Sequence, residues 1–243
     1  MLNEVVLAVI QGITEFMPVS SSGHLALVSN LISQPDLFFF TALHIASLLA
    51  VLVYTRREIK HLIKFEKDYR RMWVYLITAT IPSGIVGYYF KDVIEKSFSS
   101  LFFLGLAFFF TGFILFRTKN NNPHKILNAK NSLLIGLAQA IALFPGISRS
   151  GMTISSGLFL GIEREKAAKF SFLMFIPVSL GAFVLELGSF YFNFSLLVAF
   201  IVCFFVSLGS LNLLVKIVKK NYFWAFAFYC FLVGILSFIL FFK

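Results

Sequence analysis

Long apolar segments follow one another along almost the whole chain, separated by short polar ones. Six of them approach or exceed the roughly 20 residues that a helix needs to cross the hydrocarbon core of a bilayer. They lie at roughly 37–55, 72–90, 100–117, 169–190, 194–217 and 222–242. The pattern therefore predicts an all-α polytopic membrane protein with about six transmembrane helices, in a single integral membrane domain that covers residues 1–243.

The composition excludes a soluble domain. Hydrophobic residues make up 59% of the chain and charged residues only 13%, and the mean hydropathy is +0.88. A soluble domain is about one quarter charged, so this chain could not cover its own surface with charge. The net charge of +10 does not predict nucleic-acid binding, because the basic residues lie in short segments between apolar ones. We expect membrane lipids as neighbours and no nucleic-acid partner.

Basic residues are distributed unevenly among the connecting segments. Segment 56–71 carries seven Lys and Arg, segment 117–130 carries four, and segments 162–169 and 216–220 carry three each. Lys and Arg are enriched in the cytoplasmic loops of membrane proteins. The four segments are therefore predicted to lie on the cytoplasmic face of the plasma (inner) membrane, and the six spans then alternate in direction.

Two further apolar stretches, residues 1–35 and 131–161, are interrupted near the middle by a cluster of Pro, Ser and Gly. The charge pattern requires the first to begin and end outside the cell and the second to begin and end inside. We therefore expect two re-entrant helical hairpins that enter from opposite faces. In each, a Gln precedes a Gly by 12 positions. These features predict an inverted repeat, with one half at approximately 1–117 and the other at approximately 131–243.

The two interruptions are expected to meet at membrane depth. Non-helical backbone is tolerated there only where it is buried in protein or lines a wet cavity. Meeting turns would present Ser hydroxyls, backbone N–H groups and helix N-termini to each other, and such N-termini bind anions, phosphate above all. The residues that we expect to bind an anionic substrate in this way are Ser20, Ser22, Gly23, Ser148, Ser150, Gly151 and Thr153.

Arg149 is the most informative residue. An arginine in an apolar stretch costs at least ~2.5 kcal/mol on insertion scales, so it needs a partner or a function. Its guanidinium suits phosphate oxygens; the alternative is a structural ion pair with Glu15, and both can hold together. Glu15 lies four residues after Gln11, so the two share one helical face. Glu15 is a candidate general base and, with Gln11 in support, a candidate metal ligand.

Ser21 and His24 suggest a nucleophile. Histidine can take or give a proton at neutral pH, and a Ser near a His is the minimal nucleophile–base pair. Either Ser21 attacks the phosphorus directly or His24 activates a water, and we favour Ser21. His44, inside a predicted span, is equally consistent with a packing role and is left outside the predicted site.

Two motifs carry a resemblance to a known family. They are T-E-F-M-P-V-S-S-S-G-H-L at Thr14–Leu25 and P-G-I-S-R-S-G-M-T-I at Pro145–Ile154. With F-x-x-x-L-H at Phe39–His44 and the pattern of spans, they resemble the undecaprenyl-pyrophosphate phosphatases, the bacitracin-resistance proteins. The resemblance covers most of the chain.

The resemblance implies hydrolysis of undecaprenyl pyrophosphate to the monophosphate and inorganic phosphate, a divalent cation (Mg²⁺ or Ca²⁺), and a pocket that opens on the outer face. The family's functional motifs are an acidic E/Q-x-x-x-E element, a serine–histidine motif and P-G-x-S-R-S-G. The residues that match them here are Gln11, Glu15, Ser21, His24, Arg149 and Thr153. Gln11 stands where many members have Glu, so one carboxylate fewer is available for a cation.

The alternative function is a transporter or flippase of a polyprenyl phosphate or another anionic substrate, because inverted re-entrant hairpins are typical of transporters. Such a protein would need Arg149 and the helix N-termini, but not catalysis by other side chains. The small residues Gly181, Ala182 and Gly209 predict close helix packing, either within one chain or between the two copies of a homodimer.

Overall fold

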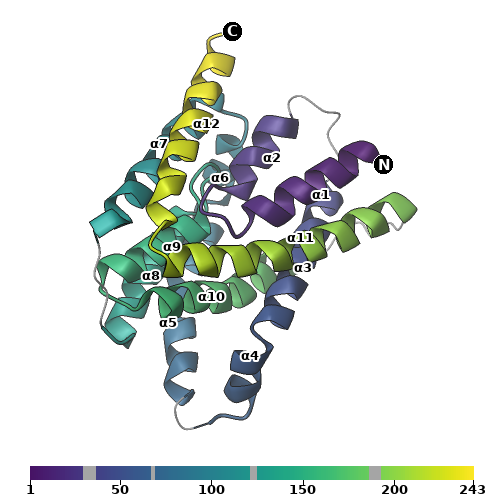
Figure 1. Ribbon diagram of the computed structural model, residues 1–243. Coiled ribbons are helices and arrows are strands. Elements are labelled where there is room, and N and C mark those ends of the chain that lie inside the picture. The colour runs from purple at the N-terminus through teal and green to yellow at the C-terminus, as the bar shows by residue number, and fades with distance from the viewer. Residues whose placement is uncertain (30–36, 67–68, 121–124, 186–192) are drawn as a thin grey trace.

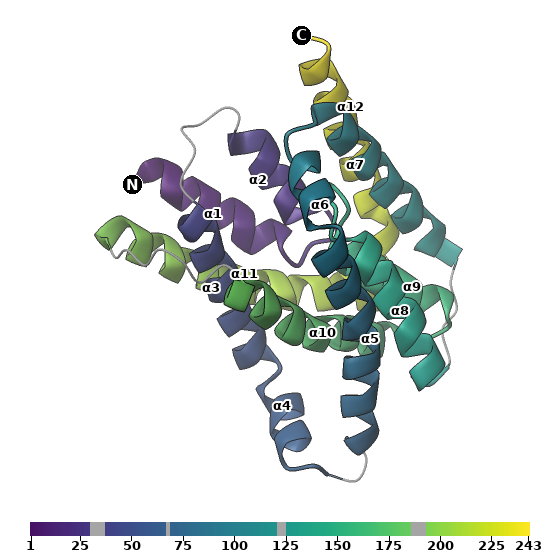
Figure 2. The ribbon, with the colours of Figure 1, turned by 180° about the vertical axis from the view of Figure 1, so that it is seen from behind.

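The computed structural model describes residues 1–29, 37–66, 69–120, 125–185 and 193–243 (Figures 1 and 2). Within these ranges the regular structure is helical, apart from an isolated bridge between Lys125 and Ile162. The predicted all-α fold is therefore confirmed. The helices, in chain order, are α1 (Leu2–Thr14), α2 (Ser21–Ser29), α3 (Leu37–Tyr54), α4 (Arg56–Ile63), α5 (Arg70–Tyr89), α6 (Lys91–Ser97), α7 (Leu101–Phe116), η1 (Arg117–Asn120), α8 (Ala129–Ile141), α9 (Arg149–Phe159), α10 (Arg164–Leu185), α11 (Phe194–Lys219), η2 (Phe223–Ala225) and α12 (Phe226–Phe241).

Helices occupy all six predicted spans, but they differ in length and hydropathy. Among the described residues, three helical segments are long and apolar enough to cross a bilayer, and a fourth candidate joins α3 to α4 across a bend of 75°. α5 begins with two arginines and α10 with a charged turn. The end of the predicted span 169–190 beyond residue 185 lies outside the described residues. The six-span arrangement therefore stays a prediction. The three spanning segments are Leu101–Lys119, Phe194–Lys219 and Phe223–Phe241.

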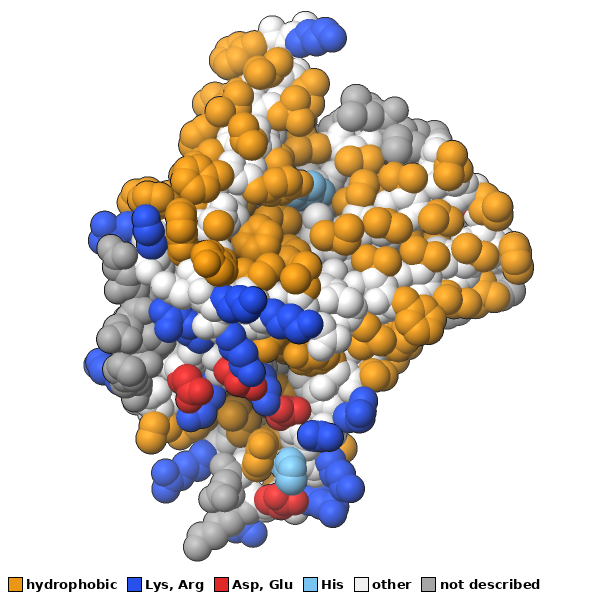
Figure 3. Space-filling view, in the orientation of Figure 1, with side chains coloured by type: hydrophobic (Ala, Val, Ile, Leu, Met, Phe, Trp, Pro, Cys, Tyr) orange, Lys and Arg blue, Asp and Glu red, His pale blue; other side chains and the backbone are white. Residues whose placement is uncertain are grey.

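The outer surfaces of α7, α11 and α12 are apolar. Large side chains point outward from each, including Phe113 with 58% of its surface exposed, Phe205 with 64% and Leu232 with 66%. Figure 3 shows apolar side chains over most of the upper half of the molecule. Apolar surface this extensive marks an interaction with protein or membrane. Together with the spanning helices, it identifies the surface that contacts lipid.

Glycines allow α7 and α12 to pack closely. Gly105 and Gly112 of α7 lie against the rings of Phe238 and Phe231 of α12. A Cβ atom added to either glycine would come within 2.8 Å or 2.6 Å, respectively, of the facing ring. Small residues at a helix contact permit this close approach between membrane helices.

The glycines for which the sequence predicts close packing, Gly181 and Gly209, are not part of this contact between α7 and α12. Gly181 and Gly209 have no atoms within 4 Å of an added Cβ, so neither is packed tightly within the described part of the chain. The side chain of Ala182 lies outside the described residues.

The two predicted halves of the chain make equivalent helix–helix contacts. α1 packs along α11, and α8 packs along α5. Gly12 of α1 lies against Val206 of α11, and Gly136 of α8 lies against the backbone of Ala79 of α5. The first helix of each predicted half therefore packs against a long helix of the other half.

Basic segments that are far apart in the chain are joined by ion pairs. Lys169 at the start of α10 pairs with Glu58 of α4, with 2.9 Å between nitrogen and oxygen. Lys219 at the end of α11 pairs with Glu165 of α10 at 2.7 Å. Three of the four segments that the charge pattern placed on one face of the membrane are thus in contact.

The fourth basic segment joins them through a hydrogen bond. Asn221, just after α11, donates from Nδ2 to the carbonyl oxygen of Lys119 at 3.1 Å. Figure 3 shows most of the Lys and Arg side chains over this lower part of the molecule. We term the region the basic end; the described residues that form it are 56–66, 69–71, 117–120, 125–130, 162–169 and 216–220.

Candidate functional site

Each interrupted stretch folds as a helix, a turn and a second helix. α1 is followed by a turn at 15–20 and by α2; α8 is followed by a turn at 142–148 and by α9. A serine caps each second helix, because Ser20 Oγ accepts from Gly23 N at 3.3 Å and Ser148 Oγ from Gly151 N at 3.1 Å. The caps satisfy N–H groups that a first helical turn leaves without partners. Residues 30–35 of the first stretch lie outside the described residues.

The two turns are in contact. Gly146 N donates to Ser20 Oγ at 3.1 Å, and Ser150 Oγ donates to the carbonyl oxygen of Met17 at 3.1 Å. Gly23 packs so closely that an added Cβ would lie 2.9 Å from Gly146 Cα. Ser20 and Gly146 have positive φ angles of 64° and 86°, which turn the chain sharply at this point. The predicted contact between the two interruptions is therefore confirmed.

Glu15 lies beside this contact with only 4% of its side chain exposed. The guanidinium of Arg149 donates to its Oε1. Oε2 accepts from Ser21 Oγ at 2.5 Å and from Gln11 Nε2 at 2.8 Å. Ser21 and Arg149 are the first residues of α2 and α9, so two helix N-termini lead to one carboxylate. We term Gln11, Glu15, Ser21 and Arg149 the polar centre.

Arg149 is held from two sides. Glu15 pairs with its guanidinium, and the aromatic ring of Phe175 packs against it. The guanidinium carbon of Arg149 lies 3.9 Å from the centre of that ring, which is a cation–π contact. A buried charge that loses its partner typically destabilises the folded protein by about 3–5 kcal/mol. Glu15 is the partner that prevents this loss for Arg149. The structural ion pair that the sequence left open is therefore present. A guanidinium has five N–H donors, so donors remain for an anion.

The structure corrects the predicted pairing of Ser21 with His24. The Ser21 hydroxyl donates to Glu15 instead. Both ring nitrogens of His24 are engaged elsewhere, since Nδ1 lies 2.7 Å from the carbonyl oxygen of Ser20 and Nε2 lies 2.7 Å from the hydroxyl of Tyr229. The ring also stacks on Tyr229, with centroids 5.5 Å apart. α12 thus holds His24, and the group that faces the Ser21 proton is a carboxylate.

His44 lies beside the polar centre, although the sequence left it out of the site. Its Nε2 lies 3.8 Å from Glu15 Oε2, and its Nδ1 lies 2.9 Å from the carbonyl oxygen of Phe40. Its side chain is 42% exposed. A histidine inside an apolar helix could have been selected by the argument that selected Arg149, because an ionisable group at membrane depth needs a partner or a function.

The remaining predicted binding residues use their hydroxyls inside the protein. Thr153 Oγ1 donates to the carbonyl oxygen of Arg149 at 2.8 Å and lies 2.6 Å from Ser171 Oγ of α10. Ser148 and Ser150 are buried, whereas Ser22 is half-buried. These contacts hold the turns and α9 in place, and substrate binding by these residues stays a prediction.

Gln11 and Glu15 offer oxygen ligands for a divalent cation. Gln11 is fully buried, and its carbonyl oxygen Oε1 has no hydrogen-bond partner in the described part of the chain. An unsatisfied buried oxygen beside a carboxylate suits Mg²⁺ or Ca²⁺, which prefer oxygen ligands. The described residues contain no group of three His, Cys, Asp or Glu side chains arranged to hold a metal. A cation here would therefore draw its other ligands from substrate and water.

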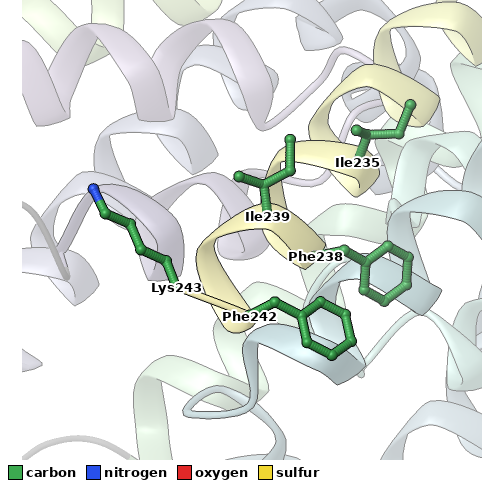
Figure 4. Close-up of a pocket in the computed structure, with 5 residues that line it drawn as sticks. All are labelled: Ile235, Phe238, Ile239, Phe242 and Lys243. Atoms are coloured by element: carbon green, nitrogen blue, oxygen red, sulfur yellow. The ribbon is translucent and has the colours of Figure 1, made fainter.

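An apolar cavity of about 460 Å³ lies elsewhere, along the C-terminal end of α12 (Figure 4). Its lining comes only from α12 and the two residues after it, and includes no member of the polar centre. Its lining residues are Ile235, Phe238, Ile239, Phe242 and Lys243. The cavity belongs to the apolar surface of α12 and is distinct from the candidate site.

The spanning helices and apolar exterior define an integral membrane protein, and its polar centre joins a buried ion pair to two helix N-termini. The chain belongs to the family described as bacitracin resistance protein BacA, whose model matches residues 4–236. The family predicted from the two sequence motifs is therefore confirmed.

Relatives named undecaprenyl-diphosphatase match the chain over nearly its full length. The protein of Thermosipho africanus is 41% identical over 245 residues, which cover 98% of this chain and 99% of the relative. The protein of Thermosipho melanesiensis is 42% identical, with 98% of each chain covered. The protein of Methanococcus maripaludis is 38% identical over 240 residues, which cover 95% of this chain and 96% of the relative.

Proposed function

We propose that this protein hydrolyses undecaprenyl pyrophosphate to undecaprenyl phosphate and inorganic phosphate. It would thereby recycle the lipid carrier of cell-wall synthesis and confer resistance to bacitracin. The observation that carries the proposal is the convergence of Ser21 and Arg149, the first residues of two helices, on the carboxylate of Glu15. Membership of the BacA family and the names of the relatives support this substrate.

Substrate binding would redistribute the contacts of Arg149. A pyrophosphate group offers several anionic oxygens, and helix N-termini favour such groups. The two N-termini at Ser21 and Arg149 would hold the phosphates, and Arg149 would then share its donors between Glu15 and the substrate. Sharing these donors leaves the Glu15 carboxylate freer to accept a proton.

The Ser21 hydroxyl is the proposed nucleophile. Its oxygen forms a bond to the terminal phosphorus, and the bond from that phosphorus to the bridging oxygen breaks, which releases undecaprenyl phosphate. The Ser21 proton passes to Glu15 Oε2, its hydrogen-bond acceptor at 2.5 Å. Water then attacks the phosphoserine, and the bond from phosphorus to the Ser21 oxygen breaks. Glu15 returns its proton to the released Ser21 oxygen, and the two protons of the water leave on inorganic phosphate. The developing charge would be stabilised by Arg149.

A divalent cation, Mg²⁺ or Ca²⁺, is proposed as the cofactor. Glu15 and the unpartnered carbonyl oxygen of Gln11 would be its protein ligands. The cation would supply positive charge to offset that of the pyrophosphate. Since both protein ligands come from α1 and the residue after it, replacing Gln11 should change the cation requirement more than it changes the fold.

The two histidines take different parts in this proposal. His44, close to Glu15 and partly exposed, is placed to receive or return a proton at the site. His24 positions the first turn, through its bonds to Ser20 and Tyr229. The alternative in which His24 activates a water would require its Nε2 to leave the Tyr229 hydroxyl, because Nδ1 faces a carbonyl oxygen and therefore carries the ring proton.

We also propose the topology that the sequence predicted: six spans, two re-entrant hairpins in an inverted repeat, and a site that opens on the outer face of the plasma membrane. The first helix of each half packs against a long helix of the other half, α1 against α11 and α8 against α5, and this equivalence supports the repeat. The matching caps at Ser20 and Ser148 support it too. Location of the four basic segments at one end supports the orientation, with that end in the cytoplasm.

The test is phosphate release by the purified protein in detergent from undecaprenyl pyrophosphate, with Mg²⁺, with Ca²⁺ and with a chelator. We expect release that needs a cation and that Arg149→Ala abolishes in a protein that still elutes as folded. Retention of the lipid without phosphate release under any condition would overturn the enzyme and favour the transporter or flippase, which needs the anion site alone.

A further inference from the structure

A second cavity, lined by both charged and apolar residues, lies at the basic end, and no residue of the polar centre lines it. Its volume is about 510 Å³. It lies where α3 bends into α4, and its other walls are the first turns of α10 and the C-terminal half of α11. We term it the basic pocket; the charged residues that line it are Arg56, Arg57, Glu58, Glu165, Lys169 and Lys219.

The acidic residues of the basic pocket are already paired. Lys169 Nζ lies 2.9 Å from Glu58 and 3.4 Å from Glu165, and Lys219 Nζ lies 2.7 Å from Glu165. Two carboxylates are thus balanced by two ammonium groups. They form an internal network that fixes α4, α10 and α11 around the cavity.

The two arginines are left with unused binding capacity. Arg56 donates one hydrogen bond to the carbonyl oxygen of Val53, at 3.4 Å. Arg57 is exposed, and no carboxylate within the described residues pairs with either guanidinium. The pocket therefore keeps two positive charges on planar groups, and such groups bind phosphate oxygens in pairs.

Apolar side chains form part of the lining of the basic pocket, next to the polar Asn212 of α11. Val53 comes from α3, and Leu208 and Val215 come from α11. α11 is one of the helices that can cross the bilayer, and the pocket lies near its basic C-terminal end. A charged rim above an apolar wall at the end of a spanning helix matches a phospholipid, whose phosphate lies at the membrane surface and whose chains extend inward.

We propose that the basic pocket binds the phosphate group of an anionic membrane phospholipid. Arg56 and Arg57 contact the phosphate oxygens, and the acyl chains run along the wall formed by α3 and α11. Inorganic phosphate has the same anionic oxygens but no chains. The two sources are therefore distinguished by whether binding requires the lipid.

Native mass spectrometry of the full-length protein in detergent, titrated with phosphatidylglycerol, with phosphatidylcholine or with inorganic phosphate, tests the proposal. The pocket variant is Arg56→Gln with Arg57→Gln. The control is Lys60→Gln with Lys64→Gln, which removes the same charge from α4 and the residue after it, outside the pocket. Two basic contacts at about 1 kcal/mol each correspond to a roughly 30-fold change in affinity. We therefore expect phosphatidylglycerol to bind roughly 30-fold more weakly to the pocket variant, and the control to bind it within about threefold of the unmodified protein, because Lys60 and Lys64 do not line the pocket.

The outcomes separate the possibilities. Selective loss of phosphatidylglycerol in the pocket variant, with phosphatidylcholine bound weakly throughout, supports a lipid site. Binding of inorganic phosphate alone at millimolar concentration, weakened in the pocket variant while phosphatidylglycerol binding is unchanged, would assign the pocket to the free ion and overturn the lipid as its occupant. Equal weakening in the pocket and control variants overturns the proposal, because charge alone would then explain the binding. Equal affinity for both lipids overturns it as well.

Discussion

Arg149 and Glu15 form an ion pair although 134 positions separate them in the chain. One residue comes from each predicted half of the protein. The pair ties the turn after α1 to the start of α9, and it fixes the carboxylate that also receives the Ser21 hydroxyl. A single carboxylate thus connects the packing of the two turns to the proposed chemistry.

Breaking this pair from either side should destabilise the protein more than removing it altogether. We expect Glu15→Gln and Arg149→Gln each to lower the free energy of unfolding by about 3–5 kcal/mol, because each leaves a buried charge without its partner. The double substitution should cost less than the sum of the two. Unfolding in detergent by denaturant titration measures all three variants. Additive losses would show that the residues do not interact in solution.

Arg149→Lys should lose most of the activity even though it keeps the charge. Lysine lacks the planar fork that contacts Glu15, lies over Phe175 and could bind a phosphate at the same time. We expect kcat for phosphate release to fall by about 10²–10³, the usual loss when one transition-state donor is removed. Arg117→Lys, at an exposed arginine after α7, is the control and should leave kcat unchanged. Full activity in Arg149→Lys would mean that a point charge suffices.

Replacing a serine hydroxyl inside and outside the polar centre tests the nucleophile. Ser21→Ala removes the hydroxyl that donates to Glu15, whereas Ser99→Ala removes an exposed one that donates to the carbonyl oxygen of Lys96. We expect at least a roughly 10²-fold loss of kcat in Ser21→Ala and a change within about threefold in Ser99→Ala. Rapid quenching with labelled substrate should also trap phosphate on Ser21. Near-normal kcat in Ser21→Ala would transfer the role of nucleophile to water.

Tyr229→Phe should reduce kcat by a few fold and leave the fold intact. The hydroxyl lies 2.7 Å from His24 Nε2, and losing such a bond typically costs about 0.5–1.5 kcal/mol. Stacking between the rings remains. Steady-state kinetics should show the change in kcat with little change in KM, and the exposed Tyr222→Phe serves as the control. An unchanged kcat would show that the orientation of His24 does not matter for turnover.

Gly23→Ala should separate the two turns. The added Cβ would lie 2.6 Å from Phe108 Cζ and 2.9 Å from Gly146 Cα, and the second contact is with backbone that cannot move aside. Overpacking of this kind costs about 1–3 kcal/mol, and we expect activity to fall with stability. Gly209→Ala, which meets no atom within 4 Å, is the matched control and should be neutral or stabilising. Normal activity in Gly23→Ala would mean that the turns do not need this contact.

The sequence located the polar centre and offered its ion pair between Glu15 and Arg149 as an alternative, but it did not predict the hydrogen bond from Ser21 to Glu15. Arg149 and Glu15 stand out because ionisable residues are rare in apolar stretches, and the shared Gln-to-Gly spacing relates the two turns to each other. The direction of the Ser21 side chain could not be predicted, because it depends on where the turn at 15–20 places Glu15. His24 was paired with Ser21 on closeness in sequence, whereas its partner Tyr229 is 205 positions away.

Runs of apolar residues located the helices better than they defined the membrane spans. A run of apolar residues predicts a helix, but bilayer crossing also depends on length and on where charges fall at its ends. α3 and α5 match their apolar runs to within about two residues, but α3 bends by 75° into α4 and α5 starts with Arg70 and Arg71, so helix position alone does not establish a bilayer crossing. The close packing at Gly105 and Gly112 was not predicted either, since a glycine in an apolar run does not reveal which helix it faces.

The ion pair between the turns also affects the order in which the protein can insert during synthesis. A ribosome adds about 5–20 residues per second, so Arg149 emerges on the order of ten seconds after Glu15. Throughout that interval the carboxylate lacks its guanidinium partner, and at the membrane depth that we propose for it such a charge is costly. The first helix–turn–helix should therefore wait at the membrane surface, or within the insertion machinery, until the second one has been made. Two halves expressed as separate chains could then assemble only together, and neither would settle into the bilayer alone.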